Sequence, residues 1–172
     1  MDLDQLYRNN LALLHKAGVS YSQYEHEPVL TYTKAAEIRV RFNLKGIESK
    51  SLFLQVKDDR YCMFISIEGK RFDTKKIKNT VGSKPRICSD QELTKITGCV
   101  PKCAVPFGHP PQVTLIIDQE IFEHEQYIYS PGPPEKTIVI RTEDINKILE
   151  NSPNKIIHYT SSTPHNELRK QQ

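Results

Sequence analysis

The spacing of apolar residues along the chain predicts helices and short strands in mixed order. Between residues 2 and 16, leucines fall near one helical face, and Gly18 follows as a helix stop. The β-rich runs 50–57 and 61–67, joined by residues 58–60, predict a β-hairpin. The first segment is therefore expected to be an amphipathic helix, and the hairpin is expected to form part of a sheet.

Capping residues mark the starts of further helices. Thr31 or Thr33 can cap a short helix, Asp73 can cap a basic helix, and Ser89 with Glu92 forms the pattern of a capping box. The other expected features are strands at 21–26, 113–118, 127–129 and 137–141, helix stops at Gly82 and Gly98, and a last helix over 142–149. The residues from 151 onward are polar and are expected to fray in part.

Strands outnumber long helices, and their order lacks a regular βαβ alternation. This pattern is typical of an α+β domain in which helices surround a curved, mixed β-sheet or barrel. The length of 172 residues fits one domain with a single real core. We expect the domain to cover residues 1–157 and a polar tail to cover residues 158–172.

Composition narrows the class of protein. No run approaches the roughly 18 to 20 apolar residues that a membrane helix needs, and the start of the chain is polar and acidic. We therefore expect a soluble, cytoplasmic protein that does not contact a membrane. The four cysteines are too few and too irregularly spaced for a disulfide framework, so free thiols are expected. The net charge of +3 says little by itself about nucleic acid.

Lys50 stands at the start of the first hairpin strand. Because side chains alternate between the faces of a strand, Lys50 shares a face with Leu52, Leu54 and Val56. A lysine aimed at the apolar side of a sheet snorkels to water, meets an anionic group or loses its proton. The pattern leaves two interpretations open: a snorkelling lysine, or a pocket cation that meets phosphate or carbonyl oxygens of a ligand.

Seven segments follow one another in a recognisable order: 25–31 (EHEPVLT), 35–36 (AA), 50–54 (KSLFL), 72–76 (FDTKK), 89–98 (SDQELTKITG), 105–108 (VPFG) and 113–118 (VTLIID). Together they resemble the YbaK-type editing domains, a family that includes the domains associated with prolyl-tRNA synthetase. The resemblance covers about residues 5–150 with this order and spacing. EHEPVLT and KSLFL are nearest to the versions in stand-alone alanyl-tRNA(Pro) deacylases.

The resemblance implies a free-standing enzyme that hydrolyses an amino acid wrongly attached to transfer RNA, chiefly Ala, Cys or another small residue on proline tRNA. The functional lysine of the family corresponds to Lys50. The family loop of glycine, three variable residues and proline corresponds to residues 102–106, with Lys102 in place of the glycine. A glycine adopts positive φ and lets a ligand approach the backbone closely, whereas Lys102 adds bulk and charge.

Hydrolysis of an aminoacyl ester needs an oriented water rather than a nucleophilic triad. We expect Lys50 to bind the terminal phosphate or the ester carbonyl, and backbone N–H groups of residues 102–106 to stabilise the oxyanion. A ribose hydroxyl of the RNA is implied to position the water, and pocket size is expected to exclude proline. The expected substrate-binding residues are His26, Leu30, Thr31, Lys102, Cys103, Ala104, Val105, Pro106 and Gly132. No cofactor and no metal ion is expected.

Basic residues gather between Gly69 and Arg86, where seven of them accompany one acidic residue. Contacts to phosphates supply most of the sequence-independent affinity for RNA, although a solvated helix face explains the same cluster. The expected RNA-binding residues are Lys45, Lys70, Arg71, Lys75, Lys76 and Lys78. The expected partners are transfer RNA, that of proline first, and prolyl-tRNA synthetase; DNA is not an expected partner.

Three alternatives stay open. Cys99, Cys103 and His109 could belong to a zinc site, although this set lacks a fourth ligand. Cys103 and His109 could act as thiol and base, although no orienting acid is obvious. A nonenzymatic module of the same fold could bind transfer RNA or a synthetase, and Lys102 is the residue that most favours this hypothesis.

Overall fold

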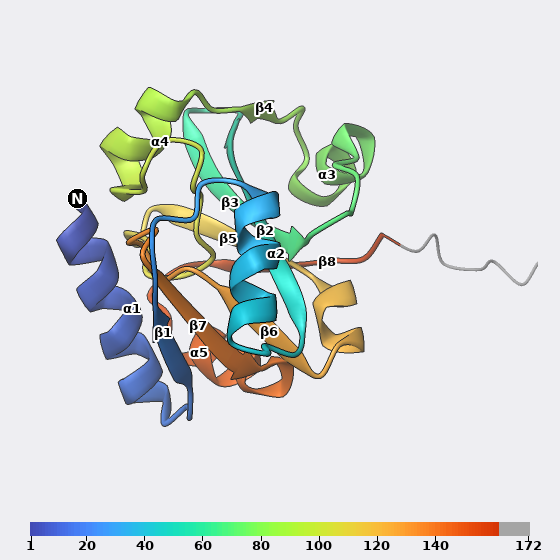
Figure 1. The fold of residues 1–172 in the computed structure, drawn as a ribbon. Helices are drawn as coiled ribbons and strands as arrows, with labels where there is room; N and C mark the ends of the chain where they lie inside the picture. The colour runs from blue at the N-terminus through green and yellow to red at the C-terminus, as the bar shows by residue number, and fades with distance from the viewer. Residues whose placement is uncertain (162–172) are drawn as a thin grey trace, which may run out of the picture.

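Strands from both halves of the chain join in one mixed, eight-stranded sheet in the computed structural model, which describes residues 1–161 (Figure 1). The strands are β1 (Ser22–Glu25), β2 (Ile47–Val56), β3 (Arg60–Ile67), β4 (Arg86–Ile87), β5 (Val113–Asp118), β6 (Gln126–Tyr129), β7 (Lys136–Arg141) and β8 (Ile156–Tyr159). The helices are α1 (Leu3–Ala17), α2 (Tyr32–Arg41), α3 (Thr74–Val81), α4 (Asp90–Thr97) and α5 (Ile145–Asn151), with 3-10 helices at Gln119–Glu123 and Thr142–Asp144. The expected α+β class with a mixed sheet is confirmed.

The sheet runs in the order β1-β7-β6-β2-β3-β5-β8, and β4 pairs with β2 outside this path. Antiparallel pairs join β2 to β3 and β6 to β7, whereas β2 pairs with β6 and β3 with β5 in parallel. The pairing of β2 with β6 involves only Ile47 and Glu48. One long strand therefore connects two parts of the sheet through a very short contact.

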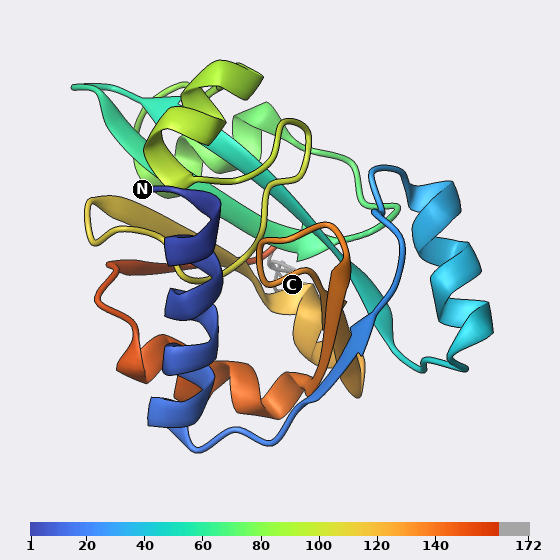
Figure 2. The ribbon, with the colours of Figure 1, turned by 60° about the vertical axis from the view of Figure 1, so that its left-hand side comes forward.

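Two apolar clusters lie on the two faces of the hairpin, as the alternation along its strands predicts. Phe53, Met63 and Ile65 belong to the larger cluster, which includes apolar residues of α1 and α5. Leu54 and Phe64 face the smaller cluster, which includes Ile77 of α3. In Figure 2, α1 and α5 lie close together, and α2 lies at the opposite side of the molecule.

The predicted caps are present. Thr31 Oγ1 accepts a hydrogen bond from the Lys34 N–H at 3.1 Å and begins α2. Asp73 caps α3, and Ser89 with Glu92 forms the expected capping box of α4. Gly18, Gly82 and Gly98 end α1, α3 and α4 in the left-handed conformation, as expected.

Two elements differ from expectation. The first hairpin strand begins at Ile47 rather than at residue 50, because Gly46 approaches β6 so closely that a Cβ there would lie 2.6 Å from the Gln126 carbonyl oxygen. Residues 156–159, expected in the frayed polar segment, form β8 parallel to the buried strand β5. Tyr159 of β8 is only 2% exposed, so the packed chain continues past residue 157.

Residues 162–172 of the expected tail lie outside the described residues. Within residues 1–161, no helix combines the length and the apolar character that crossing a membrane requires.

Candidate functional site

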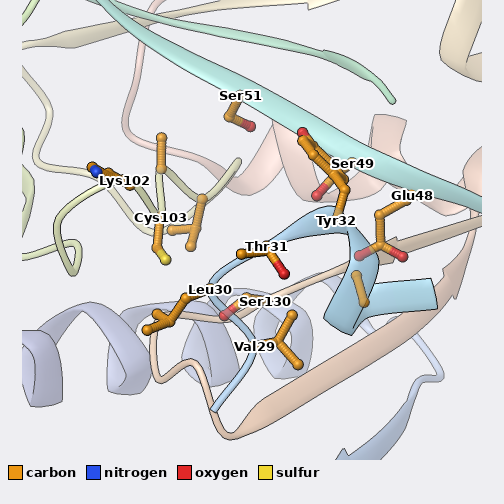
Figure 3. A pocket seen from close by; sticks show the side chains of 13 residues that line it. Val29, Leu30, Thr31, Tyr32, Glu48, Ser49, Ser51, Lys102, Cys103 and Ser130 are labelled. Carbon is orange, nitrogen blue, oxygen red and sulfur yellow. The ribbon is translucent and has the colours of Figure 1, made fainter. Parts of the chain in front are cut away.

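A cavity of about 160 Å³ opens between the start of α2, one edge of β2 and the loop after α4 (Figure 3). Its volume equals that of about five water molecules in the liquid, which suits a small amino acid and its ester group. The residues that line it are Val29, Leu30, Thr31, Tyr32, Ala35, Glu48, Ser49, Ser51, Lys102, Cys103, Ala104, Val105 and Ser130. Residues distant in sequence therefore meet at one strand edge.

The edge of β2 is open along the cavity because its two partners on that side occupy only its ends. β6 pairs with Ile47 and Glu48, and β4 pairs with Leu54 and Gln55. On the other side, the Glu68 N–H donates to the Glu48 carbonyl at 2.8 Å, so Glu48 is a residue whose backbone faces β3. Such residues alternate in an antiparallel pair. Ser49 and Ser51 consequently turn their backbone N–H and C=O groups away from β3. Ser51 lies beyond the pairings with β6 and β4, so its backbone groups face the open edge.

The hydroxyl of Ser51 adds an unused hydrogen-bonding group to the cavity wall. Its Oγ is buried and has no hydrogen-bond partner among the described residues. A buried polar atom without a partner costs free energy, about 1 to 3 kcal/mol, and such atoms are rare in folded proteins. Ser51 therefore offers the cavity both a hydroxyl and a main-chain edge group for a bound ligand.

The loop after α4 forms the opposite wall, and hydrogen bonds from its backbone N–H groups hold it in place. Lys102 has a φ of 65°, a left-handed conformation that favours glycine. Its N–H donates to Asp90 Oδ1 at 3.1 Å, and the Cys103 N–H donates to the Val100 carbonyl at 2.9 Å. We expected several N–H groups of residues 102–106 to face a substrate. Those of Lys102 and Cys103 are already hydrogen-bonded within the protein, so fewer donors remain for a substrate. Ala104, which lines the cavity, keeps an N–H without a partner among the described residues.

A carboxylate closes the end of the cavity that lies far from Lys102. Glu48 stands beside Tyr32 at the α2 end, whereas Lys102 lies at the other end (Figure 3). Its Oε2 is buried without a hydrogen-bond partner in the described chain. Burial raises the pKa of Glu48 to about 7, the positive charge of Arg39 opposes this rise, and the negative charge of Glu68 adds to it. Arg39 is instead ion-paired with Glu68, at 3.8 Å.

Lys50 is not brought together with these residues. It shares the face of Leu54 and the smaller cluster, as the alternation predicted, and its Nζ donates to the Lys70 carbonyl at 2.8 Å. The cavity instead contains its neighbours, Ser49 and Ser51. The expected arrangement, in which Lys50 and the 102–106 loop share one cavity, is absent from the described residues, because the Lys50 ammonium is held at the Lys70 carbonyl and Lys50 does not line the cavity.

The other predicted pocket residues divide into two groups. Leu30, Thr31, Lys102, Cys103, Ala104 and Val105 line the cavity as expected. His26 does not, since its ring nitrogens bond to the Glu27 carbonyl and to Thr137 Oγ1, each at 2.7 Å. Pro106 is buried behind the loop, and Gly132 lies against α1, near Leu6.

Two of the basic residues expected to bind RNA have their ammonium groups engaged within the protein. Lys70 forms ion pairs with Asp118 and Glu120, and the Lys76 ammonium donates to the Ser161 carbonyl. Lys45, Arg71, Lys75 and Lys78 are exposed. Of the residues expected to contact RNA, these four present their charge to solvent.

The zinc and thiol alternatives find no support in the described part of the chain. Residues 1–161 contain no group of three His, Cys, Asp or Glu side chains placed to hold a metal ion. Burial raises the pKa of Cys103, which disfavours the thiolate that a nucleophile needs. His109 is buried, its Nε2 bonds to the Val105 carbonyl at 2.6 Å, and burial lowers its pKa to about 4. This histidine supports the loop rather than a reactive thiol.

The segment that contains the cavity matches a known protein family. The sequence model of the aminoacyl-tRNA editing domain matches residues 26–148, which contain every residue of the cavity wall. The chain belongs to this editing-domain family. The expected family is thus confirmed, and with it the expected class of enzyme, an aminoacyl-tRNA deacylase.

Two curated relatives and one solved structure extend the comparison. The multifunctional Ser/Thr-tRNA deacylase ProXp-y of Escherichia coli is 25% identical over 145 residues, covering 81% of this chain and 86% of that protein. The prolyl-tRNA editing protein ProX of Acetoanaerobium sticklandii is 25% identical over 146 residues, covering 81% and 88%. A candidate trans-editing enzyme for prolyl-tRNA synthetase has the same fold, with a TM-score of 0.70, 19% identity and coverage of 91% and 98%.

Five polar residues of the cavity wall were not predicted from the sequence: Tyr32, Glu48, Ser49, Ser51 and Ser130. A strand begun at residue 47 would have placed Ser49 beside Ser51 on the face opposite Lys50. No local pattern connects Glu48 with the loop at 102–105, because that contact depends on where α2 packs.

Replacing Glu48 with glutamine should stabilise the protein in a pH-dependent way. The folded-state pKa of about 7 exceeds the ordinary value of 4.5, so ionisation of Glu48 destabilises the folded state as the pH rises from 4.5 to 7. Glu48→Gln should raise the free energy of unfolding at pH 8 by about 2 to 3 kcal/mol and leave it nearly unchanged at pH 4.5. Urea denaturation at both pH values measures this, with exposed Glu150→Gln as the control. A gain that is independent of pH would contradict it.

Replacing Lys102 with glycine should relieve the left-handed backbone. Lys102→Gly is expected to raise the free energy of unfolding by up to about 1 kcal/mol, net of the extra chain entropy of glycine when unfolded. Lys102→Ala removes the charge but keeps the Cβ, so it should give no such gain. Thermal and urea denaturation of both variants separate strain from charge, and equal stability of the two would refute the strain.

Proposed function

We propose that the chain hydrolyses mischarged transfer RNA that carries a small amino acid, with Ala, Cys and Ser as candidates and proline tRNA as the first RNA to test. The observation that carries this proposal is a cavity of about 160 Å³ at the open edge of β2, inside an editing domain. Five hydroxyl-bearing residues line it: Thr31, Tyr32, Ser49, Ser51 and Ser130. Their polarity favours seryl over prolyl esters, because a proline ring offers no hydrogen bond to a buried hydroxyl.

Hydrolysis requires a water molecule, a site for the developing oxyanion and a route for one proton. Water attacks the ester carbonyl carbon, the bond to the ribose oxygen breaks, and the proton of the water passes to that ribose oxygen. The backbone N–H groups of Ala104 and Ser51 lie on opposite walls, and we assign them to the oxyanion, where one fixed donor contributes about 3 kcal/mol. The products are a free amino acid and an uncharged RNA end.

The RNA would approach over the exposed basic residues. Lys45 precedes β2, and Arg71, Lys75 and Lys78 lie on α3 or just before it; all four are exposed. Lys50 Nζ uses one N–H on the Lys70 carbonyl, which leaves two for a phosphate oxygen. We therefore assign Lys50 to anchoring the RNA rather than to the reacting ester. A prolyl-tRNA synthetase partner is part of the same proposal and rests on the family resemblance alone.

A deacylation panel tests this function. Proline tRNA charged with Ala, Cys, Ser or Pro is incubated with the wild type, with Ser51→Ala and with Ser20→Ala, an exposed serine outside the cavity. We expect release of a small amino acid, prolyl-tRNA cleaved no faster than in buffer, and a loss of about 10-fold in kcat/KM for Ser51→Ala alone. Lys50→Ala should raise KM more than it lowers kcat. Tight binding of RNA without release of any amino acid would instead identify a nonenzymatic module.

A further inference from the structure

Glu48 is an acidic residue of the cavity wall to which the proposed hydrolysis gives no role. Its carboxylate accepts no hydrogen bond and forms no ion pair within residues 1–161, although one of its oxygens is buried. The nearby guanidinium of Arg39 pairs with Glu68 and donates to the Gly46 carbonyl at 3.0 Å. Arg39 therefore makes no ion pair with Glu48, although its own Nε has no partner, and Glu48 has no counter-ion within residues 1–161.

A buried carboxylate without a partner is costly and persists where a ligand supplies the missing charge. An aminoacyl ester with a free α-amino group supplies this charge when the amine is protonated, and that amine lies one carbon from the reacting carbonyl. The RNA end of the same molecule is anionic. The cavity has matching polarity, with Glu48 at the α2 end and Lys102 at the other end (Figure 3).

We infer that Glu48 binds the α-ammonium group of the aminoacyl ester and thereby makes the site selective for substrates with a free amino group. This inference rests on the proposed function and adds a specificity residue to it. Ser49 and Ser51 then meet the ester and the side chain, while Glu48 fixes the end of the substrate that all amino acids share. The site would exclude N-blocked esters, such as those of formylated or peptidyl RNA, by leaving Glu48 buried and unpaired.

The protonation of Glu48 is expected to change when substrate binds. Burial raises the pKa of Glu48 to about 7 in the unliganded protein, and an ammonium group beside it would lower that value again. Substrate binding therefore favours the ionised carboxylate. A general base at this position would act on water instead, and the two roles differ in their dependence on the amino group.

The test compares the aminoacyl-tRNA that the wild type cleaves fastest with the same RNA after N-acetylation. Single-turnover rates are divided by the rate of each ester in buffer, because acetylation alone slows spontaneous hydrolysis. We expect the wild type to prefer the free amine at least about 10-fold. Glu48→Gln should lower the normalised rate on the free amine by roughly 10- to 100-fold and leave that on the N-acetyl ester within about 2-fold. Glu150→Gln, which removes an exposed carboxylate outside the cavity, should keep the preference.

Each other outcome overturns the inference in a distinguishable way. Equal normalised rates of the wild type on both esters would refute it without any variant, even if Glu48→Gln failed to fold. An equal loss on both esters in Glu48→Gln would identify a general base or a structural role. If the wild type cleaved neither ester nor any member of the deacylation panel, the proposed function would fail, and this inference would fail with it.

Discussion

The cavity exists because β2 cannot pair along its whole length on both sides. β6 meets it at Ile47 and Glu48, β4 meets it at Leu54 and Gln55, and the residues between keep an unpaired edge. Backbone N–H and C=O groups at such an edge need hydrogen-bond partners, and in most proteins another strand supplies them. Here the loop after α4 and the start of α2 enclose the edge without pairing with it. A set of fixed donors and acceptors thus remains available to a ligand.

Three features of the cavity wall lower the stability of the folded state. Ser51 has a buried hydroxyl without a partner, Glu48 has a buried carboxylate without a cation, and Lys102 has a left-handed backbone. These features lie together on the wall of one cavity, while the two apolar clusters supply the compensating stability. Strain and unpaired polar groups concentrate at functional sites for this reason. Removing either unpaired polar group, at Glu48 or at Ser51, is therefore expected to reduce activity.

Local patterns in the sequence predicted the hairpin, the caps of α2, α3 and α4, and the family. Alternation correctly placed Lys50 on the face of Leu54, but it could not show where the edge of β2 lies open to a cavity. That depends on the short contact between β2 and β6, a tertiary feature fixed by the close approach of Gly46 to Gln126. Strand β8 was missed for a related reason, since its short apolar stretch gains stability only from pairing with the buried strand β5. The loop at 102–106 was recognised by its family motif, whereas Glu48 became a site residue only through the packing of α2.

The central claim is that the aminoacyl group lies at the open edge of β2, beside Ser51, and not against the Lys50 ammonium. A crystal structure with a nonhydrolysable seryl-adenosine analogue, in which an amide replaces the ester, tests this most directly. We expect the amide carbonyl within hydrogen-bond distance of the Ser51 or Ala104 N–H, and the ammonium group beside Glu48. An analogue bound against Lys50 and the Lys70 carbonyl, with the cavity at Ser51 empty, would contradict it.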